Sequence, residues 1–301
     1  MSYYRFGSKG DIIREIQAAL GLDVDGIFGR MTEAAVKNFQ MKNGLHPDGV
    51  VTPEVMSILF ENDFSTDLYE RYNKKFQYDT YYLPQNEYVD EITKKEYIFL
   101  HHTRGSNNPY FVIDGWAKDT RGRIATEFVI GGKSLRGDDE FDGVVVQAFP
   151  ENRWAYHLGS RINKYLQKHS IGIEICNFGE LEYRDGKFYN FLNRVVPEEH
   201  VCTLKEPYRG HIYYHDYTEA QIKALERLLI HLGDRNSIDL KKGLQEWLKS
   251  FSATISFDYF IPAIEGKVKG VLSHTNIIKS HDTKKDVYPH PKLVEMIKRL
   301  K

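Results

Sequence analysis

Four short segments, far apart along the chain, carry histidine and carboxylate side chains that can bind a metal ion where a fold brings them together. They are Leu100–Thr103, Trp154–Gly159, Ser170–Ile175 and the tail from His274 to Asp286. A hydrolytic zinc ion takes about three nitrogen or oxygen ligands and keeps one position for water, with a carboxylate nearby to accept a proton. No segment is diagnostic alone, but together they predict one such site.

Two of these segments have the pattern of buried strands. Residues 97–100 form a continuous apolar run, typical of a central strand covered on both faces. Because strand side chains alternate, His101 and Thr103 should face one side and His102 the other. In residues 170–176 the isoleucines face one side, and Glu174 and Cys176 face the other.

A carboxylate in so apolar a strand is costly unless it is functional or paired. Burial would raise the pKa of Glu174 toward that of a useful general base. The alternative is that Glu174 forms an ion pair across the sheet.

The surrounding patterns predict an α/β fold, with a central mixed β-sheet flanked by helices. Residues 126–130 and 143–147 indicate a hairpin with a long loop, 133–142, and residues 268–272 indicate a further strand. Helices are expected from the Thr218–Gln221 capping box onward, over 240–251 and over 291–300. Residues 180–216 have the pattern of an insertion beside the cleft, and its histidines are rival metal ligands: His200, His211 and His215.

The first 60 residues predict a separate three-helix bundle. We expect Ser8 to cap the first helix, Thr32 the second, and Thr52 followed by Pro53 the third. The connections share an Asp-Gly turn, at Asp25 and at Asp48. Residues 63–94 lack regular apolar patterns and are interpreted as a linker that becomes an irregular, packed approach segment.

Composition excludes some classes of function. The 41 basic and 42 acidic side chains leave a net charge of −1, without the basic stripe of a nucleic-acid-binding protein. The 20 tyrosines are compatible with a carbohydrate-binding cleft or with ordinary packing. We expect Cys176 and Cys202 to be free thiols. We also expect a monomer without a membrane span or Sec signal peptide, made in the cytoplasm and brought to an external substrate by another system.

The order and surroundings of the four segments resemble the zinc-dependent N-acetylmuramoyl-L-alanine amidases, the type 2 amidase family that includes phage lysozyme-like amidases and peptidoglycan recognition proteins. The resemblance covers roughly residues 95–300. It implies Zn²⁺ as cofactor and peptidoglycan as substrate. The roles that it assigns are metal ligands at His101, His274 and Asp286, a catalytic proton acceptor at Glu174, a cation near the scissile carbonyl at Lys284, and substrate contacts at His157, Thr103 and Trp154.

Three departures from the family pattern bear on this assignment. Glu127 stands where the family commonly has histidine, and Val287-Tyr288-Pro289 replaces Pro-Gly-Pro. The interval from His274 to Asp286 is also longer than usual, so Asp282 or His281 remains an alternative third ligand.

Residues 7–60 resemble the peptidoglycan-binding type 1 module, on about a dozen positions that include the Asp-Gly turns. We therefore expect a wall-binding module over 1–62, an approach segment over 63–94 and a zinc amidase domain over 95–301. The combination predicts a phage endolysin-type peptidoglycan hydrolase. The alternatives are a non-catalytic peptidoglycan receptor on the same fold and a cytosolic muropeptide-recycling amidase.

Overall fold

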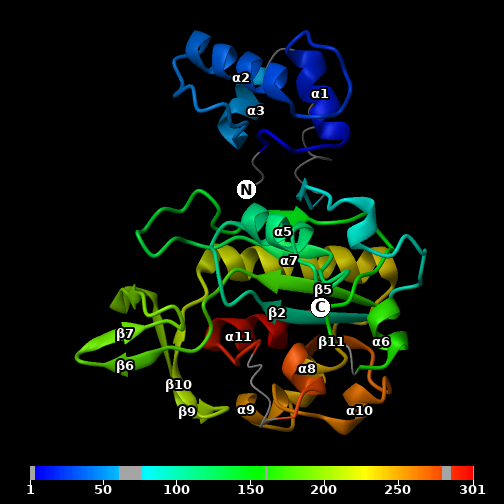
Figure 1. Ribbon diagram of the computed structural model, residues 1–301, viewed down its shortest axis with the longest axis vertical. Helices are drawn as coiled ribbons and strands as arrows, with labels where there is room; N and C mark the ends of the chain where they lie inside the picture. The colour runs from blue at the N-terminus through cyan, green and yellow to red at the C-terminus, as the bar shows by residue number, and fades with distance from the viewer. Residues whose placement is uncertain (1–3, 61–75, 160–161, 280–285, 301) are drawn as a thin grey trace.

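The computed structural model describes residues 4–60, 76–159, 162–279 and 286–300, and it has a small helical module beside a larger α/β domain (Figure 1). The module contains α1 (Asp11–Ala19), α2 (Arg30–Lys42) and α3 (Pro53–Leu59). Its core is buried apolar side chains that include Ile13, Ile16, Phe28, Val36 and Val55. The expected three-helix bundle is confirmed.

The module is built from a repeated helix–turn unit. Gln17 in α1 donates to Asp25 Oδ1 (2.7 Å), and its own carbonyl accepts the Gly26 N–H (2.8 Å). Gln40 in α2 does the same with Asp48 (2.7 Å) and Gly49 (2.9 Å). Each buried glutamine therefore holds the turn that follows its helix, which is why the two Asp-Gly turns share one pattern.

Two of the predicted helix caps are wrong. Glycines occupy the N-cap positions of α1 and α2 and give no side-chain cap. The Ser8 hydroxyl instead accepts the Arg5 N–H, and Thr32 is buried within α2, where it accepts from Gln17. The third cap is confirmed, because Thr52 accepts the Val55 N–H.

The larger domain is centred on a six-stranded mixed sheet of order β1-β4-β3-β5-β2-β11. Its strands are β1 (Asp79–Thr80), β2 (Tyr97–His102), β3 (Phe128–Ile130), β4 (Val145–Gln147), β5 (Ser170–Ile175) and β11 (Gly270–Ser273). Strands β5, β2 and β11 are parallel, whereas β3 and β4 form the predicted antiparallel hairpin. The α/β fold is confirmed, and β1 shows that the approach segment contributes the edge strand.

Helices cover both faces of this sheet (Figure 1). The long α7 (Glu219–Asn236) begins with the predicted capping box and packs on one face, together with α11 (Pro291–Arg299). The other face carries α5 (Pro109–Ala117) and a second apolar cluster around Ile113, Val129 and Cys176. The remaining helices of the domain are α6 (Lys164–His169), α8 (Leu244–Trp247), α9 (Ala253–Ser256) and α10 (Ile261–Ile264), with short 3₁₀ turns at η1 (Gln85–Glu87), η2 (Glu198–His200) and η3 (His274–Ile277).

The helix predicted over 240–251 is wrong in extent, because only Leu244–Trp247 is α-helical there. Gly243 has φ +78°, and a Cβ at this position would lie 2.3 Å from the Val271 carbonyl oxygen. The close approach of this segment to β11 therefore prevents a helix from starting earlier.

The insertion over 180–216 forms two small sheets beside the main one (Figure 1). The first contains β6 (Glu182–Arg184), β7 (Lys187–Tyr189) and β8 (Val195–Val196), and the second contains β9 (Val201–Tyr208) and β10 (His211–His215). Cys176 and Cys202 are both free thiols, as expected. Among the helices that the structure describes, none has the length and apolar character needed to cross a membrane.

Candidate metal centre

The ends of three neighbouring parallel strands bring the candidate residues together. His101 is the partner of Glu174 in the register of β2 with β5. Ser273, the last residue of β11, is the partner of Leu100, so His274 follows beside His101. The carboxyl ends of parallel strands are where open α/β sheets place their ligands. Strand register therefore creates the site.

Three donor atoms converge at this edge of the sheet. His101 Nδ1 lies 3.5 Å and His274 Nδ1 3.1 Å from Asp286 Oδ2, and the three ligand atoms lie within 4.8 Å of one another. Two zinc ligands at the usual zinc–nitrogen or zinc–oxygen bond length in a tetrahedron are separated by about 3.3 Å. The three residues thus fit a zinc ion by donor type and by spacing.

A chain of hydrogen bonds sets the tautomer of His101. The Ser170 hydroxyl donates to the Leu166 carbonyl oxygen (2.5 Å) and lies 2.7 Å from His157 Nε2. Because that hydroxyl hydrogen is used, His157 Nε2 is the donor to Ser170, and His157 Nδ1 is left as an acceptor for His101 Nε2–H (2.9 Å). The lone pair of His101 is then on Nδ1, which faces Asp286.

Gly172 on β5 makes this arrangement possible. A Cβ at this position would lie 2.9 Å from His157 Nδ1. Only a glycine therefore leaves His157 room to reach over β5 to His101.

The electrostatics of the site favour an ionised Asp286. Burial alone would raise the pKa of this carboxyl, but the neighbouring imidazoles of His274 and His101 hold it well below its usual range. Glu174 Oε2 lies 4.0 Å from His101 Nδ1, and its side chain is 16% exposed, so it borders the metal ligands and still reaches solvent. His102 is buried, with its Nδ1 3.3 Å from the Tyr217 hydroxyl oxygen, and burial lowers its pKa, so this ring is neutral.

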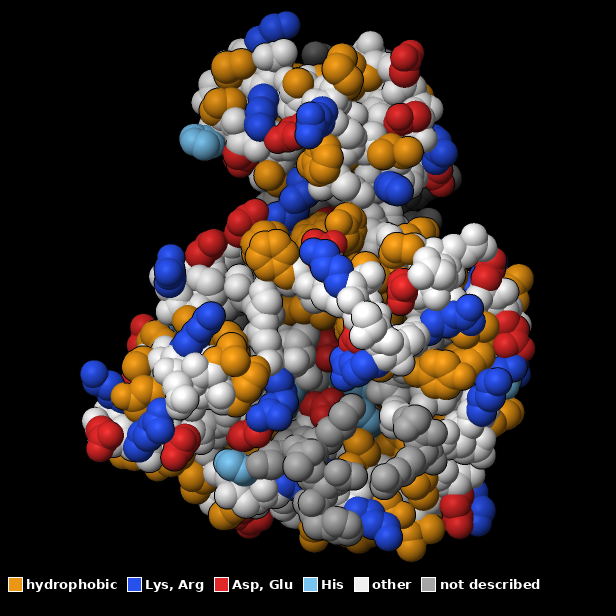
Figure 2. Space-filling model, in the orientation of Figure 1, with side chains coloured by type: hydrophobic (Ala, Val, Ile, Leu, Met, Phe, Trp, Pro, Cys, Tyr) orange, Lys and Arg blue, Asp and Glu red, His pale blue; other side chains and the backbone are white. Residues whose placement is uncertain are grey.

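An open pocket of about 360 Å³ lies over these residues. Its walls come from the end of β2 and the residues after it, from α5, from β5 and from the segments 124–126 and 154–159. Its lining residues are His101, His102, Thr103, Arg104, Trp116, Ile124, Ala125, Thr126, Tyr156, His157, Glu174 and Asp286. Figure 2 shows a hollow in this face of the molecule, with acidic side chains inside it. His101 and Asp286 thus face this pocket, whereas His274 is buried behind them.

The predicted substrate residues occupy different positions relative to this pocket. Thr103 and His157 line it, and the Thr103 hydroxyl exchanges two hydrogen bonds with the Asn177 backbone. Trp154 is buried outside the lining, where its indole N–H donates to Glu91 (3.0 Å) and its ring packs edge-on against Tyr156. Lys284, and the alternative ligands His281 and Asp282, lie outside the described residues.

The insertion histidines are not part of this cluster. His215 is buried, and burial lowers its pKa to about 3. Within the described residues, the other group with metal-ligand spacing is Cys202, Asp216 and His290. His290 Nδ1 accepts the Lys292 N–H, so its Nε2 carries the proton and donates to Asp216 (2.5 Å), to which Lys292 is also paired. In this second group, Asp216 is therefore already occupied by a hydrogen bond from His290 and an ion pair with Lys292.

Glu127, at the position where the family commonly has histidine, faces away from the pocket. It is 1% exposed and pairs with Arg235 of α7 (3.0 Å) and Gln147 (3.2 Å). Glu127 is therefore part of the packing between the sheet and α7.

Sequence comparison decides the family. Residues 92–289 match the family described as N-acetylmuramoyl-L-alanine amidase, and residues 10–59 match the one described as putative peptidoglycan binding domain. The chain belongs to the N-acetylmuramoyl-L-alanine amidase family. The resemblances inferred from both parts of the sequence are confirmed.

Individual relatives match this amidase-family chain less completely. It is 47% identical over 52 residues to an uncharacterized protein in the bpoA1 3′ region of Kitasatospora aureofaciens, which is 15% of this chain and 44% of that protein. A fused Zn-dependent amidase/peptidase/peptidoglycan-binding domain-containing protein of Clostridium acetobutylicum is 34% identical, over 22% of this chain and 31% of that one, with a TM-score of 0.19. AmpDH3 of Pseudomonas aeruginosa is 20% identical over 69% of this chain and 60% of its own, with a TM-score of 0.37. The chain thus spans less than half the length of the first two.

Two residues of the site were missed by sequence reasoning. The sequence pattern places Ser170 only in a strand, yet its hydroxyl continues the hydrogen-bond chain from His101 through His157 to the Leu166 carbonyl oxygen. The alternating pattern places Gly172 only within a strand, although a glycine between isoleucines in a buried strand signals the close approach of another group.

Proposed function

We propose that this chain hydrolyses the amide bond between the lactyl group of N-acetylmuramic acid and L-alanine in peptidoglycan, using a zinc ion held by His101, His274 and Asp286. The observation that carries the proposal is the convergence of these three donors beside an open pocket, which His101, Asp286 and Glu174 line. Membership of the amidase family supports the choice of bond.

Zinc bound at these residues would lower the pKa of a water molecule toward about 7 and polarise the scissile carbonyl. Glu174 would accept the proton of the attacking water and pass it to the leaving amine, because its carboxylate borders the ligands and remains partly exposed. The His157 and Ser170 hydrogen bonds would keep His101 in the tautomer that presents Nδ1.

The remaining roles concern the substrate. Thr103 and His157 would contact it from the pocket wall, and Trp154 would act through Tyr156, against which it packs. Lys284 would stabilise the oxyanion, a role that rests on its match to the family motif. The wall-binding type of module favours action on intact walls, as in an endolysin-type lytic enzyme, over recycling of soluble fragments.

The test is digestion of purified cell walls by the full chain, with and without a chelator. We expect new muramyl lactyl ends without new reducing ends, activity lost on chelation and restored by zinc, and zinc largely lost from His101→Ala. Wall binding without any bond cleavage in the zinc-loaded protein would instead support the receptor alternative. Stoichiometric zinc in His101→Ala would contradict the ligand assignment.

A further inference from the structure

Strands β9 and β10 are joined by a two-residue turn, and the first residue of this turn is of a type that rarely occurs there. Arg209 and Gly210 both have positive φ, 47° and 84°. Two-residue turns of this kind prefer Asn-Gly, because a side chain with Cβ is disfavoured in the left-handed region. An arginine here points to a requirement for its side chain.

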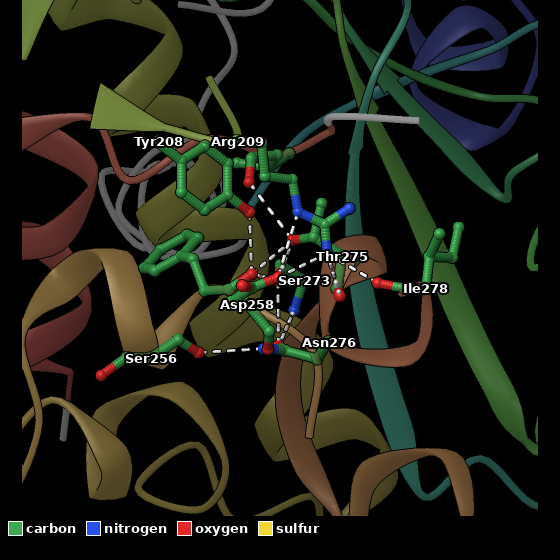
Figure 3. A network of polar contacts seen from close by, with 10 residues as sticks. Tyr208, Arg209, Ser256, Asp258, Ser273, Thr275, Asn276 and Ile278 are labelled. Atoms are coloured by element: carbon green, nitrogen blue, oxygen red, sulfur yellow. Dashed lines mark hydrogen bonds and ion pairs between the residues drawn. The ribbon is translucent and has the colours of Figure 1, made fainter. Parts of the chain in front are cut away.

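That side chain is buried and directed at the chain segment that carries a metal ligand (Figure 3). The Arg209 side chain is 1% exposed, and its Nη2 donates to Asp258 Oδ1 (2.7 Å) and to the carbonyl oxygens of Thr275 (3.0 Å) and Ile278 (2.6 Å). These two carbonyls belong to and follow η3, the turn that begins at His274. The guanidinium therefore clamps the backbone directly after a metal ligand.

Further hydrogen bonds hold the same turn (Figure 3). The Phe257 carbonyl oxygen accepts from the hydroxyls of Tyr208 (2.8 Å) and Thr275 (2.6 Å). Asn276 donates to the carbonyl oxygens of Ser256 (2.9 Å) and Asp258 (2.8 Å). Residues 273–276 are all 0% exposed. His274 thus sits in a turn that is held on both sides.

The same hairpin contacts the chain just after the other ligand, Asp286. Tyr288 donates its hydroxyl hydrogen to the His215 carbonyl oxygen at the end of β10 (2.7 Å). Its ring also stacks on Tyr214 of β10, with centroids 4.2 Å apart. The hairpin therefore contacts both ends of the segment that runs from His274 to Asp286.

We propose that the β9–β10 hairpin is a positioning element for the metal centre, and that Arg209 is the positioning residue that fixes His274. The inference deepens the proposed function and rests on its zinc site. It gives the 180–216 insertion a role: it holds two of the three ligands at the spacing that zinc requires. Side chains that orient ligands from outside the coordination sphere typically change metal affinity about 10–100-fold.

The test compares Arg209→Met with Arg235→Met in the full chain. Arg235 is the matched control, since it is also a largely buried arginine paired with a carboxylate, but its partners are Glu127 and Glu151 and not the η3 turn. Zinc affinity is measured by competition with a chelator, and the zinc-induced rise in melting temperature is recorded for each folded variant. We expect zinc affinity to fall about tenfold or more in Arg209→Met and to stay near wild type in Arg235→Met.

Equal zinc affinities of Arg209→Met and Arg235→Met, with the wild type binding zinc, would overturn the inference and leave the proposed function standing. A wild type that binds no zinc would overturn both. If Arg209→Met does not fold, the pair Arg209→Lys and Arg235→Lys decides, because lysine can keep one of the three contacts. A lower zinc affinity in Arg209→Lys alone supports the inference, and no difference overturns it.

Discussion

Glu174 is the residue whose substitution separates a catalytic role from a structural one. It is paired in register with His101 and lies close to the metal ligands while reaching solvent. We predict that Glu174→Gln keeps the fold and zinc, because the side chains are nearly isosteric, while turnover falls about 100-fold or more from loss of the general base. Melting temperature, zinc content and amide hydrolysis on one preparation measure this. Normal turnover with normal zinc would remove Glu174 from the mechanism.

A second prediction for a single residue concerns His157, which is hydrogen-bonded to the candidate metal ligand His101. His157→Phe removes the acceptor for His101 Nε2–H, and we expect zinc affinity to fall about 10–100-fold. Ser170→Ala should weaken zinc binding less, since it frees His157 to change tautomer without removing the ring. Chelator competition measures both. Wild-type zinc affinity in His157→Phe would leave His157 as a substrate contact only.

At the scale of elements, the edge strand β1 contains a buried carboxyl. Asp79 is 2% exposed and accepts a hydrogen bond from the Tyr110 hydroxyl. Burial raises its pKa from 3.8 to about 7, against the opposing effects of Tyr110 and Arg5. Between these two pH values, the Asp79 carboxyl keeps its proton in the folded chain and has lost it in the unfolded chain. Asp79 therefore stabilises the folded chain at a pH below the pKa that its carboxyl has in the unfolded chain. This stabilisation is lost as the pH rises through about 7, the pKa in the folded chain.

Asp79→Asn removes this titration. We subtract the melting temperature of the wild type from that of the variant at each pH. We predict that this difference is a few degrees larger at pH 8 than at pH 5, because only the wild type loses stability as Asp79 ionises. Thermal unfolding at both pH values measures the difference. The same offset at the two pH values would show that Asp79 is ionised in the folded chain.

At the scale of the whole molecule, the module contacts the amidase domain away from the pocket. Arg5 pairs with Glu140 (2.8 Å) and lies over the rings of Tyr110 and Phe141, and the Lys9 carbonyl oxygen accepts from Thr80 (2.5 Å). None of these residues lines the pocket. These contacts therefore link the module to the amidase domain through residues that do not line the pocket.

We predict that deletion of residues 1–60 weakens co-sedimentation with intact walls and leaves hydrolysis of small soluble muropeptides nearly unchanged. Sedimentation and soluble-substrate assays on the same two proteins measure this. A folded 61–301 fragment that no longer cleaves a small substrate would show that the module takes part in catalysis.

Much of the fold was determined by the sequence alone, because its signals are local. Apolar runs and alternation located β2 and β5, the Thr218–Gln221 box located the start of α7, and Pro291 located α11. The same local patterns predicted which face of each strand His101 and Glu174 occupy. Caps were less predictable: Ser8 and Thr32 have the residue type of a cap, but each forms a different hydrogen bond in the folded chain.

Only the tertiary structure decided how these pieces meet. The register of β2 with β5 and β11 places His101 beside Glu174 and His274, and register depends on contacts between strands that are far apart in sequence. The partners of His157 and Arg209 are likewise separated from them by up to 69 positions. A hydrogen bond has a range of about 3 Å, so no local pattern can reveal which distant groups will come within it.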